Sequence, residues 1–280
     1  KRFSPPESLK AKIQVLQIDL LNEASLNNIP NNIDGAFYLV HSMSTSSHYQ
    51  KLEQKSAGII VLCHGIPSGK KDQNDPGYEY LAQTLTVQGY TTVIFNFRGA
   101  GESSGDFDLR GWAEDLREVV DFISPVSNSL LPVVLFGFSA GAAVAIYAFA
   151  HNDNRIKGLI LCGCPADFDS LIQEKGLEKF LAYCKEIGII KSPNFPYDLS
   201  AWGESFVLIR PEFWISQIKS IPKLILHGDQ DEVVPIAHAY LLYEKALDPK
   251  ELKIIKNAGH RLRLNEEAMK AAQDWLRKLF

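Results

Sequence analysis

The chain has 280 residues, of which 46% are hydrophobic and 22% charged, with a formal net charge of −4 and a pI near 6.0. This composition is ordinary for a globular protein and excludes a disordered or fibrous chain. The scattered Lys and Arg residues make no basic face for nucleic acid, and no apolar stretch approaches the ~20 residues of a membrane-spanning helix. We therefore expect neither a nucleic-acid partner nor a membrane span.

The predicted elements alternate between short β-branched runs and helical segments. Eight candidate strands follow in chain order: Ile13–Leu20, Ala36–His41, Gly58–Cys63, Thr91–Asn96, Pro132–Phe136, Lys157–Cys162, Lys223–Leu226 and Leu252–Ile255. Helical patterns fall at Tyr78–Gln88, Gly111–Ile123, Ala140–Ala150, Ile236–Lys245 and Glu266–Leu279. Continuously apolar strands that alternate with helices predict an α/β fold with a mainly parallel sheet flanked by helices. Because no helix separates the first two strands, we expect them to form an antiparallel, hairpin-like edge.

One long interval breaks this alternation. Residues 165–221 contain no convincing strand and indicate helix, a proline-rich passage, and then aromatic-rich helix or loop. A connection of this length between two strands is uncommon. We therefore predict a helical cap at residues 165–221, inserted after the sixth strand, and an α/β core made of residues 1–164 and 222–280.

The four cysteines are Cys63, Cys162, Cys164 and Cys184. Three of them lie in apolar, strand-like runs, where a thiol behaves as a small hydrophobic group. Cys162 and Cys164 could form half of a metal site, but no second Cys/His pair has suitable spacing. We expect buried free thiols rather than a disulfide or a metal site. Reduced thiols, and first residues that lead into no hydrophobic signal-peptide core, favour a cytoplasmic protein.

A nucleophile elbow is predicted around Ser139. An apolar strand runs into Gly137-Phe138-Ser139-Ala140-Gly141, and a helix of small residues follows. The G-x-S-x-G pattern alone is weak, because a chain of this size shows one by chance about one time in ten. A strand before it and a helix after it are what the elbow requires. The alternative is an ordinary glycine-rich turn between a strand and a helix.

A serine hydroxyl needs a base to become a good nucleophile. His260 follows the last predicted strand, and an acidic loop follows the strand before it. Both therefore lie just past the carboxyl ends of strands, where ligands bind in open α/β sheets. We predict His260 as the general base. The carboxylate behind it comes from the acidic loop, where spacing alone does not separate Asp229, Asp231 and Glu232.

The loop Cys63-His64-Gly65-Ile66-Pro67 follows another apolar strand and is a candidate for half of an oxyanion hole. Ile66 is the best donor because Pro67 has no N–H group. The backbone N–H of Ala140 would supply the other half. His64 could be a second catalytic histidine, but we expect a structural role in which its ring holds this loop.

Other polar residues are predicted to be structural. The run Gly99–Gly105 has the spacing G-x-G-x-x-x-G, which differs from a dinucleotide fingerprint, and Arg98 is expected to anchor that loop. His227 ends a strand and is expected to be a satisfied core histidine. His238 has no partner at useful spacing, so we expect it to be a surface or packing residue.

These motifs together resemble the α/β-hydrolase superfamily. They are His64-Gly65, residues 96–103, the elbow at Ser139, residues 228–235 and Ala258-Gly259-His260. Within the superfamily they are most similar to the serine-aminopeptidase-like and cinnamoyl-esterase-like branch, over roughly residues 57–280. The resemblance implies an eight-stranded core, an acyl-enzyme mechanism and a cap. It also favours Asp231 over Asp229, because Asp231 is the acidic residue of the pattern G-x-x-D-x-x-V-P in residues 228–235.

We therefore expect a serine hydrolase of the carboxylesterase type that acts on a small to medium apolar acyl or aryl ester. Ser139 would attack the ester carbonyl, His260 would take the proton and Asp231 would fix the tautomer of His260. The N–H groups of Ile66 and Ala140 would receive the negative charge, and neither a cofactor nor a metal would be needed. The expected partner is a small ester or amide.

Two alternatives stay open. An aminopeptidase or amidase of the same fold would need acidic groups in the cap to hold an amine, and the candidates are Asp167, Asp169, Glu174 and Glu178. A catalytically silent binding protein is less favoured, because the serine, histidine and carboxylate all lie at strand ends. The cap aromatics could line an acyl pocket or fasten the cap to the core: Phe168, Phe180, Tyr183, Trp202, Phe206, Phe213 and Trp214.

Overall fold

The computed structural model describes residues 37–40, 56–69, 75–126, 131–151, 153–173 and 176–280. The predicted strand Ile13–Leu20 and the cap residue Glu174 lie outside these ranges. Within them, no helix is long and apolar enough to cross a membrane.

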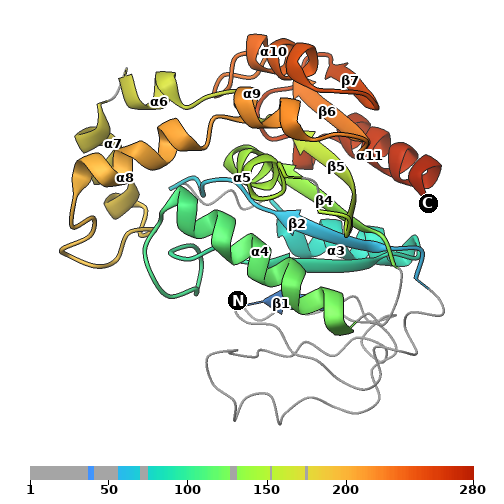
Figure 1. Ribbon diagram of the computed structural model, residues 1–280, viewed down its shortest axis with the longest axis horizontal. Helices are drawn as coiled ribbons and strands as arrows, with labels where there is room; N and C mark the ends of the chain where they lie inside the picture. Colours follow the sequence, from blue (N-terminus) through green and yellow to red (C-terminus); the bar gives the residue numbers. More distant parts are fainter. Residues whose placement is uncertain (1–36, 41–55, 70–74, 127–130, 152, 174–175) are drawn as a thin grey trace.

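The described strands form one parallel sheet in the order β1-β3-β2-β4-β5-β6-β7 (Figure 1). Their bounds are β1 (Phe37–Val40), β2 (Ile59–Cys63), β3 (Thr91–Phe95), β4 (Val133–Phe138), β5 (Ile156–Cys162), β6 (Lys223–Gly228) and β7 (Lys250–Ile255). Strands β2 to β7 make the six-stranded body of the sheet, and β1 pairs with β3 at its edge, with Phe37 opposite Thr92. The mainly parallel sheet is confirmed. An eighth strand and the antiparallel hairpin stay predictions, because they depend on residues outside the described part.

The strands carry apolar side chains on both faces of the sheet. In β2, Ile59, Val61 and Cys63 join one buried cluster, whereas Ile60 and Leu62 join the other. This division follows from the two-residue period of a strand. Because both faces are covered, the run is continuously apolar rather than alternating.

Helices cover both faces (Figure 1). Buried residues of α4 (Leu109–Val126), α5 (Ala140–Ala148) and α10 (Ala237–Lys245) belong to the first cluster. Those of α3 (Gly77–Val87) and α11 (Glu266–Leu279) belong to the second. Apolar residues spaced three and four apart make one side of α11 buried.

The segment between β5 and β6 is helical, as expected. It contains α6 (Asp169–Gln173), α7 (Leu177–Glu186), α8 (Leu199–Leu208), α9 (Pro211–Trp214) and the 3-10 turn η1 (Ile215–Gln217). Figure 1 shows α6, α7 and α8 grouped at one end of the molecule. Trp202 stacks on Phe180, and its indole N–H donates to the carbonyl of Phe107 at 3.0 Å. The buried aromatic cluster thus joins α7 and α8 to the loop before α4.

A set of hydrogen bonds also ties this segment to the loop after β3. Asp106 Oδ1 accepts from the backbone N–H groups of Lys191 and Ser192 at 2.6 and 2.8 Å. Lys191 Nζ donates to the carbonyl of Ser103 at 2.8 Å, and Phe107 N–H donates to Ile189 at 2.9 Å. The connection between α7 and α8 is therefore anchored to the α/β core at a point far from both ends of the segment.

Candidate active site

Ser139 lies in a sharp turn between β4 and α5. Its φ is 52° and its ψ is −126°, a left-handed conformation that is strained for a residue with a side chain. Its N–H donates to the carbonyl of Cys162 at 2.8 Å, and its own carbonyl accepts from Ala142 at 3.0 Å. The surrounding structure therefore holds the strained backbone on both sides.

Glycines on both sides of Ser139 allow this turn. A Cβ at Gly137 would lie 2.4 Å from Cα of Ala142, and a Cβ at Gly141 would lie 2.3 Å from the carbonyl oxygen of His64. Real Cβ atoms essentially never approach so closely. The G-x-S-x-G pattern is thus a packing requirement at this strand-to-helix turn, which distinguishes it from a chance match.

The structure brings Ser139, His260 and Asp231 together. His260 Nε2 lies 3.0 Å from Ser139 Oγ, and His260 Nδ1 lies 2.8 Å from Asp231 Oδ2. A carboxylate only accepts, so Nδ1 carries the hydrogen and Nε2 is free to accept from the serine hydroxyl. The three residues follow β4, β7 and β6, whose carboxyl ends meet at one edge of the parallel sheet.

The side chain of Asp231 has no exposed surface and is held by its own loop. Its Oδ1 accepts from the N–H groups of Val233 and Val234 at 2.9 and 2.8 Å. Burial acts to raise the pKa of Asp231, but the hydrogen bonds from His260, Val234 and Val233 outweigh it and hold that pKa below its ordinary value. Asp229 is exposed, and its backbone N–H donates to Ile255. The geometry therefore places Asp231, rather than Asp229, behind the imidazole.

Gly163 lies beside the hydrogen-bonded relay formed by Ser139, His260 and Asp231. The sequence pattern did not reveal this position. Gly163 directly follows β5 and has a φ of +55°, and a Cβ there would lie 3.2 Å from His260 Cε1 and 3.5 Å from Asp231 Oδ2. A side chain at this position would press on both groups. Only the Gly between Cys162 and Cys164 could have hinted at a close approach.

The loop after β2 lies directly against the serine. A Cβ at Gly65 would be 2.9 Å from Cβ of Ser139, and Ile66 lines the space beside the serine together with Ala140. Ala140 begins α5, so its N–H is one of the first-turn donors without a partner inside the helix. Ile66 and Ala140 are thus placed next to Ser139, and their role as oxyanion donors stays a prediction.

His64 has the structural role expected for it. Its ring is buried, its Nε2 accepts from Phe97 N–H at 3.1 Å, and its Nδ1 lies 2.7 Å from the carbonyl of Gly65. Burial lowers the pKa of His64 to about 4, against the opposing effect of the Gly65 hydrogen bond, so the ring is neutral. Arg98 is also confirmed as an anchor, because its backbone N–H, Nε and Nη2 all donate to the Asp115 carboxylate at 2.7 to 2.9 Å.

In the described part of the chain, two cavities share Ser139 and His260 in their walls. One cavity, of about 390 Å³, is bounded by the segment between β5 and β6, from which Phe168, Leu171 and Phe180 line its wall. The other, of about 470 Å³, lies on the side of α3 and η2 (Leu262–Leu264). Ser139 therefore lies between two cavities and is part of the wall of each.

The aromatic residues of the segment divide between the two roles considered for them. Phe168, Phe180 and Tyr183 line the smaller cavity. Trp202 packs in the aromatic cluster, and Trp214 packs on Tyr147 at a ring distance of 5.2 Å. Phe206 also packs on Trp202, whereas Phe213 is 62% exposed and lies under the Arg210 guanidinium, outside both roles.

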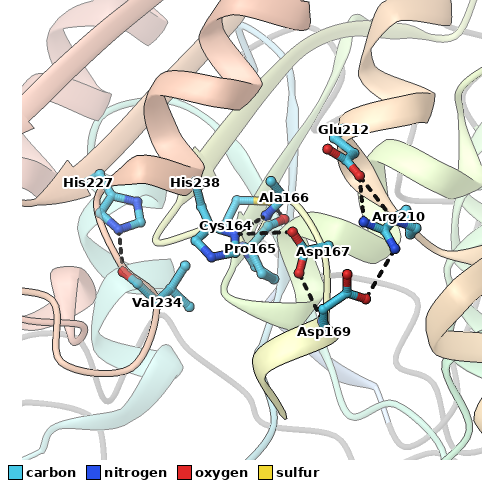
Figure 2. Close-up of polar contacts among 10 residues, drawn as sticks. All are labelled: Cys164, Pro165, Ala166, Asp167, Asp169, Arg210, Glu212, His227, Val234 and His238. Carbon is cyan, nitrogen blue, oxygen red and sulfur yellow. Dashed lines mark hydrogen bonds and ion pairs between the residues drawn. The ribbon is translucent and has the colours of Figure 1, made fainter. Parts of the chain in front are cut away.

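A polar group lies on the wall of the smaller cavity (Figure 2). Ala166 N–H donates to His238 Nδ1 at 2.9 Å, and Asp167 Oδ2 lies 4.0 Å from the same nitrogen. Asp167 Oδ1 accepts from Asp169 N–H, and Arg210 binds the Asp169 carboxylate at 3.1 Å. His238, expected to be a surface or packing residue without a partner at useful spacing, therefore has polar partners. Its partners lie about 70 residues earlier in the chain, and spacing along the sequence does not reveal them.

His227 departs in part from its predicted role. It is fully buried, as expected, and its Nε2 lies 2.8 Å from the carbonyl of Val234 (Figure 2). Its Nδ1 is buried without a partner among the described residues, so the histidine is only half satisfied. The contact of Nε2 with Val234 could not be predicted, because it depends on how the acidic loop folds back over the strand.

The four thiols are buried and free, which confirms the expectation for the cysteines. Burial raises the pKa of each thiol, so these side chains are unreactive in the folded protein. Among the described residues, no group of three or more His, Cys, Asp or Glu side chains could hold a metal ion.

Comparison with known proteins gives a consistent picture. Residues 54–186 match the family described as serine aminopeptidase, S33. The chain is 25% identical to the uncharacterized protein YfhR of Escherichia coli (strain K12), over 72% of this chain and 62% of that protein. The match therefore spans less than two thirds of that relative. Serine hydrolase BPHL of Mus musculus is 25% identical over 82% of each chain.

Two solved structures show the same fold. Est1E from Butyrivibrio proteoclasticus, solved with ferulic acid bound, has a TM-score of 0.60 at 22% identity, covering 80% of this chain and 90% of that one. The monoacylglycerol lipase of Paleococcus ferrophilus has a TM-score of 0.58 at 17% identity, covering 80% and 95%. With the sheet order, the elbow and the relatives above, these likenesses show that the chain belongs to the α/β-hydrolase superfamily, and its residues 54–186 are similar to the serine aminopeptidase S33 family.

Proposed function

We propose that the protein is a serine hydrolase that cleaves carboxylic esters through an acyl-enzyme. The observation that carries this proposal is the relay in which Asp231 Oδ2, His260 and Ser139 Oγ are joined by contacts of 2.8 and 3.0 Å. The strained backbone of Ser139 supports it, because such strain persists where the surrounding structure enforces it, often at active sites.

In this mechanism Ser139 Oγ attacks the ester carbonyl carbon while His260 Nε2 takes the hydroxyl proton. The carbonyl oxygen becomes negative and accepts from the N–H groups of Ile66 and Ala140. The tetrahedral intermediate then expels the alcohol, which receives the proton from His260. Water repeats the sequence on the acyl-enzyme and releases the acid. Asp231 keeps the hydrogen on Nδ1 and stabilises the imidazolium.

The smaller cavity supports an apolar acyl or aryl group of small to medium size. Phe168, Leu171 and Phe180 give it an apolar wall, and a volume of about 390 Å³ is at the lower end of the range for ligand sites. We propose that residues 165–221 act as a cap that provides this wall. The ferulic acid bound to the structurally similar Est1E is an aromatic acid, and an aryl acyl group is compatible with the same kind of surface.

A specific observation also favours an aminopeptidase or amidase as the second candidate. The carboxylates of Asp167 and Glu232 lie in the wall of the cavity that contains Ser139, where they could bind the ammonium group of an amine substrate. The other acidic candidates fit this role less well. Asp169 is bound to Arg210, and Glu178 is exposed outside the cavity.

The test is labelling with a fluorophosphonate, followed by assays on p-nitrophenyl esters and aminoacyl anilides. We expect the label on Ser139 and a loss of turnover on the order of 10⁴–10⁶ in Ser139→Ala. Ser200→Ala, which changes an exposed serine of α8, is the matched control and should retain full activity. Labelling elsewhere, or an active Ser139→Ala, would contradict the mechanism. A preference for anilides over esters would favour the second candidate.

A further inference from the structure

His227 contacts Asp231, the carboxylate of the relay. It lies near the carboxyl end of β6, four residues before Asp231, and its side chain has no exposed surface. Its Nε2 is 2.8 Å from the carbonyl oxygen of Val234, which Figure 2 shows, and 3.4 Å from Asp231 Oδ2. The proposed mechanism assigns no role to this imidazole.

The surroundings determine where the hydrogen of His227 lies. Two acceptors, a carbonyl oxygen and a carboxylate oxygen, face Nε2, so Nε2 carries the hydrogen. Nδ1 then holds a lone pair that meets no donor among the described residues. Burial lowers the pKa of His227, against the opposing effects of Val234 and Asp231, and the ring is therefore neutral near pH 7.

His227 completes the set of donors around Asp231. Oδ1 receives the N–H groups of Val233 and Val234, and Oδ2 faces the N–H groups of His260 and, at a longer distance, His227. Val234 is held at both ends, since its N–H binds Asp231 and its carbonyl accepts from His227. A closed ring of contacts thus joins His227, Val234 and Asp231.

We propose that His227 is a positioning residue for the reaction of Ser139. Its Nε2–H holds the Val234 turn and the far side of Oδ2, and the carboxylate thereby keeps the orientation in which it accepts from His260. A neutral donor suits this place. A second cation here would compete with the imidazolium of His260 for the same carboxylate. The charged or titratable groups that act on His227 are Asp231, His260 and His238. This inference rests on the proposed hydrolase function.

The experiment compares His227→Leu, which removes the donor, with His227→Gln, whose amide N–H reaches nearly as far as Nε2. For ester hydrolysis we expect His227→Leu to lose roughly 3- to 10-fold in kcat with little change in KM, the effect of one hydrogen bond. We expect His227→Gln to recover most of the loss. The acid limb of the kcat/KM profile, which reports the essential base, should move to lower pH only in His227→Leu, because a less firmly held carboxylate stabilises the imidazolium less.

A control separates positioning from stability. Ile225→Ala removes a fully buried side chain of the same strand without touching the relay, so it should unfold more easily while its kcat per folded molecule stays unchanged. Equal kcat and equal pH profiles for wild type and His227→Leu would overturn the inference. So would a His227→Gln variant as impaired as His227→Leu. A wild-type protein with neither ester cleavage nor fluorophosphonate labelling would overturn the hydrolase function as well.

Discussion

The carbonyl oxygen of His64 occupies the place that a side chain on Gly141 would need. A Cβ on Gly141 would lie 2.3 Å from that oxygen and 2.4 Å from the carbonyl oxygen of Cys63. The first turn of α5 therefore packs directly on the end of β2. These two backbone contacts set the separation between Ser139 and the loop that carries Ile66.

Gly141→Ala should consequently damage both stability and activity. Overpacking of this kind costs typically about 1–3 kcal/mol, and the forced separation would move Ile66 away from Ser139. Urea unfolding and ester hydrolysis measure the two effects. Gly188→Ala is the control, because Gly188 has a φ of +76° but no described atom within 4 Å of its missing Cβ. Gly188→Ala should be less stable but as active as wild type. An equal loss of activity in both variants would contradict the role proposed for the contact between Gly141 and His64.

Asp231→Asn should lower kcat about 10⁴-fold, because an amide no longer enforces the tautomer in which His260 Nε2 accepts from the serine. Asp229→Asn should stay near the wild-type rate, since its side chain lies outside the relay. Steady-state kinetics on one ester, with circular dichroism to verify folding, measure both variants. If the two losses were reversed, Asp229 would be the catalytic carboxylate.

The size of the acyl group should be limited by α6. Leu171 lies in the wall of the smaller cavity, so Leu171→Trp should reduce kcat/KM for an octanoate ester at least 10-fold more than for an acetate ester. Val207→Trp, which enlarges an exposed residue of α8, should leave the ratio of kcat/KM for the two esters unchanged. A uniform decrease for both esters in Leu171→Trp would show that acyl chains occupy another space.

Acid should weaken the attachment of α3 to η2 through the ion pair of Asp75 and Arg263. Burial acts to raise the pKa of Asp75, but hydrogen bonds from Arg263 and Gly77 outweigh it and leave that pKa below its ordinary value. A lowered folded-state pKa means that the stabilisation is present above the unfolded value of about 3.9 and is lost as the pH falls through the folded value.

We expect Arg263→Met to be less stable than wild type by about 1 kcal/mol at pH 7, and this difference should shrink as the pH falls below about 4. Urea unfolding at a series of pH values measures it. A difference that stays constant across this range would mean that the packing of Arg263 on the ring of Tyr78, rather than the ion pair, carries its contribution.

The sequence predicted the relay because each of its members follows a strand of one parallel sheet. The carboxyl ends of such strands share an edge, so Ser139, His260 and the acidic loop could be placed together from local patterns alone, although Ser139 and His260 are 121 positions apart. The resemblance to a known family then separated Asp231 from Asp229, which spacing did not. Predicted strands and helices also agree closely with β2 to β7 and the helices that cover them.

Other parts of the site depend on contacts that have no local pattern. His238 reaches Ala166, and Arg210 reaches Asp169, only because the segment between β5 and β6 folds back on itself and over α10. Gly163 matters because two other loops meet beside it. Such features follow from tertiary packing, and neither hydrophobic period nor motif spacing encodes them.

The hydrogen bonds of Asp106 with Lys191 and Ser192 have a mechanical consequence. They fasten the inserted segment at its midpoint, and the chain itself fastens its two ends to β5 and β6. Movement of the whole segment away from the core would break these bonds and also the hydrogen bond from the Trp202 indole to the carbonyl of Phe107. The wall that this segment gives to the cavity beside Ser139 is therefore held to the core at its midpoint as well as at its two ends.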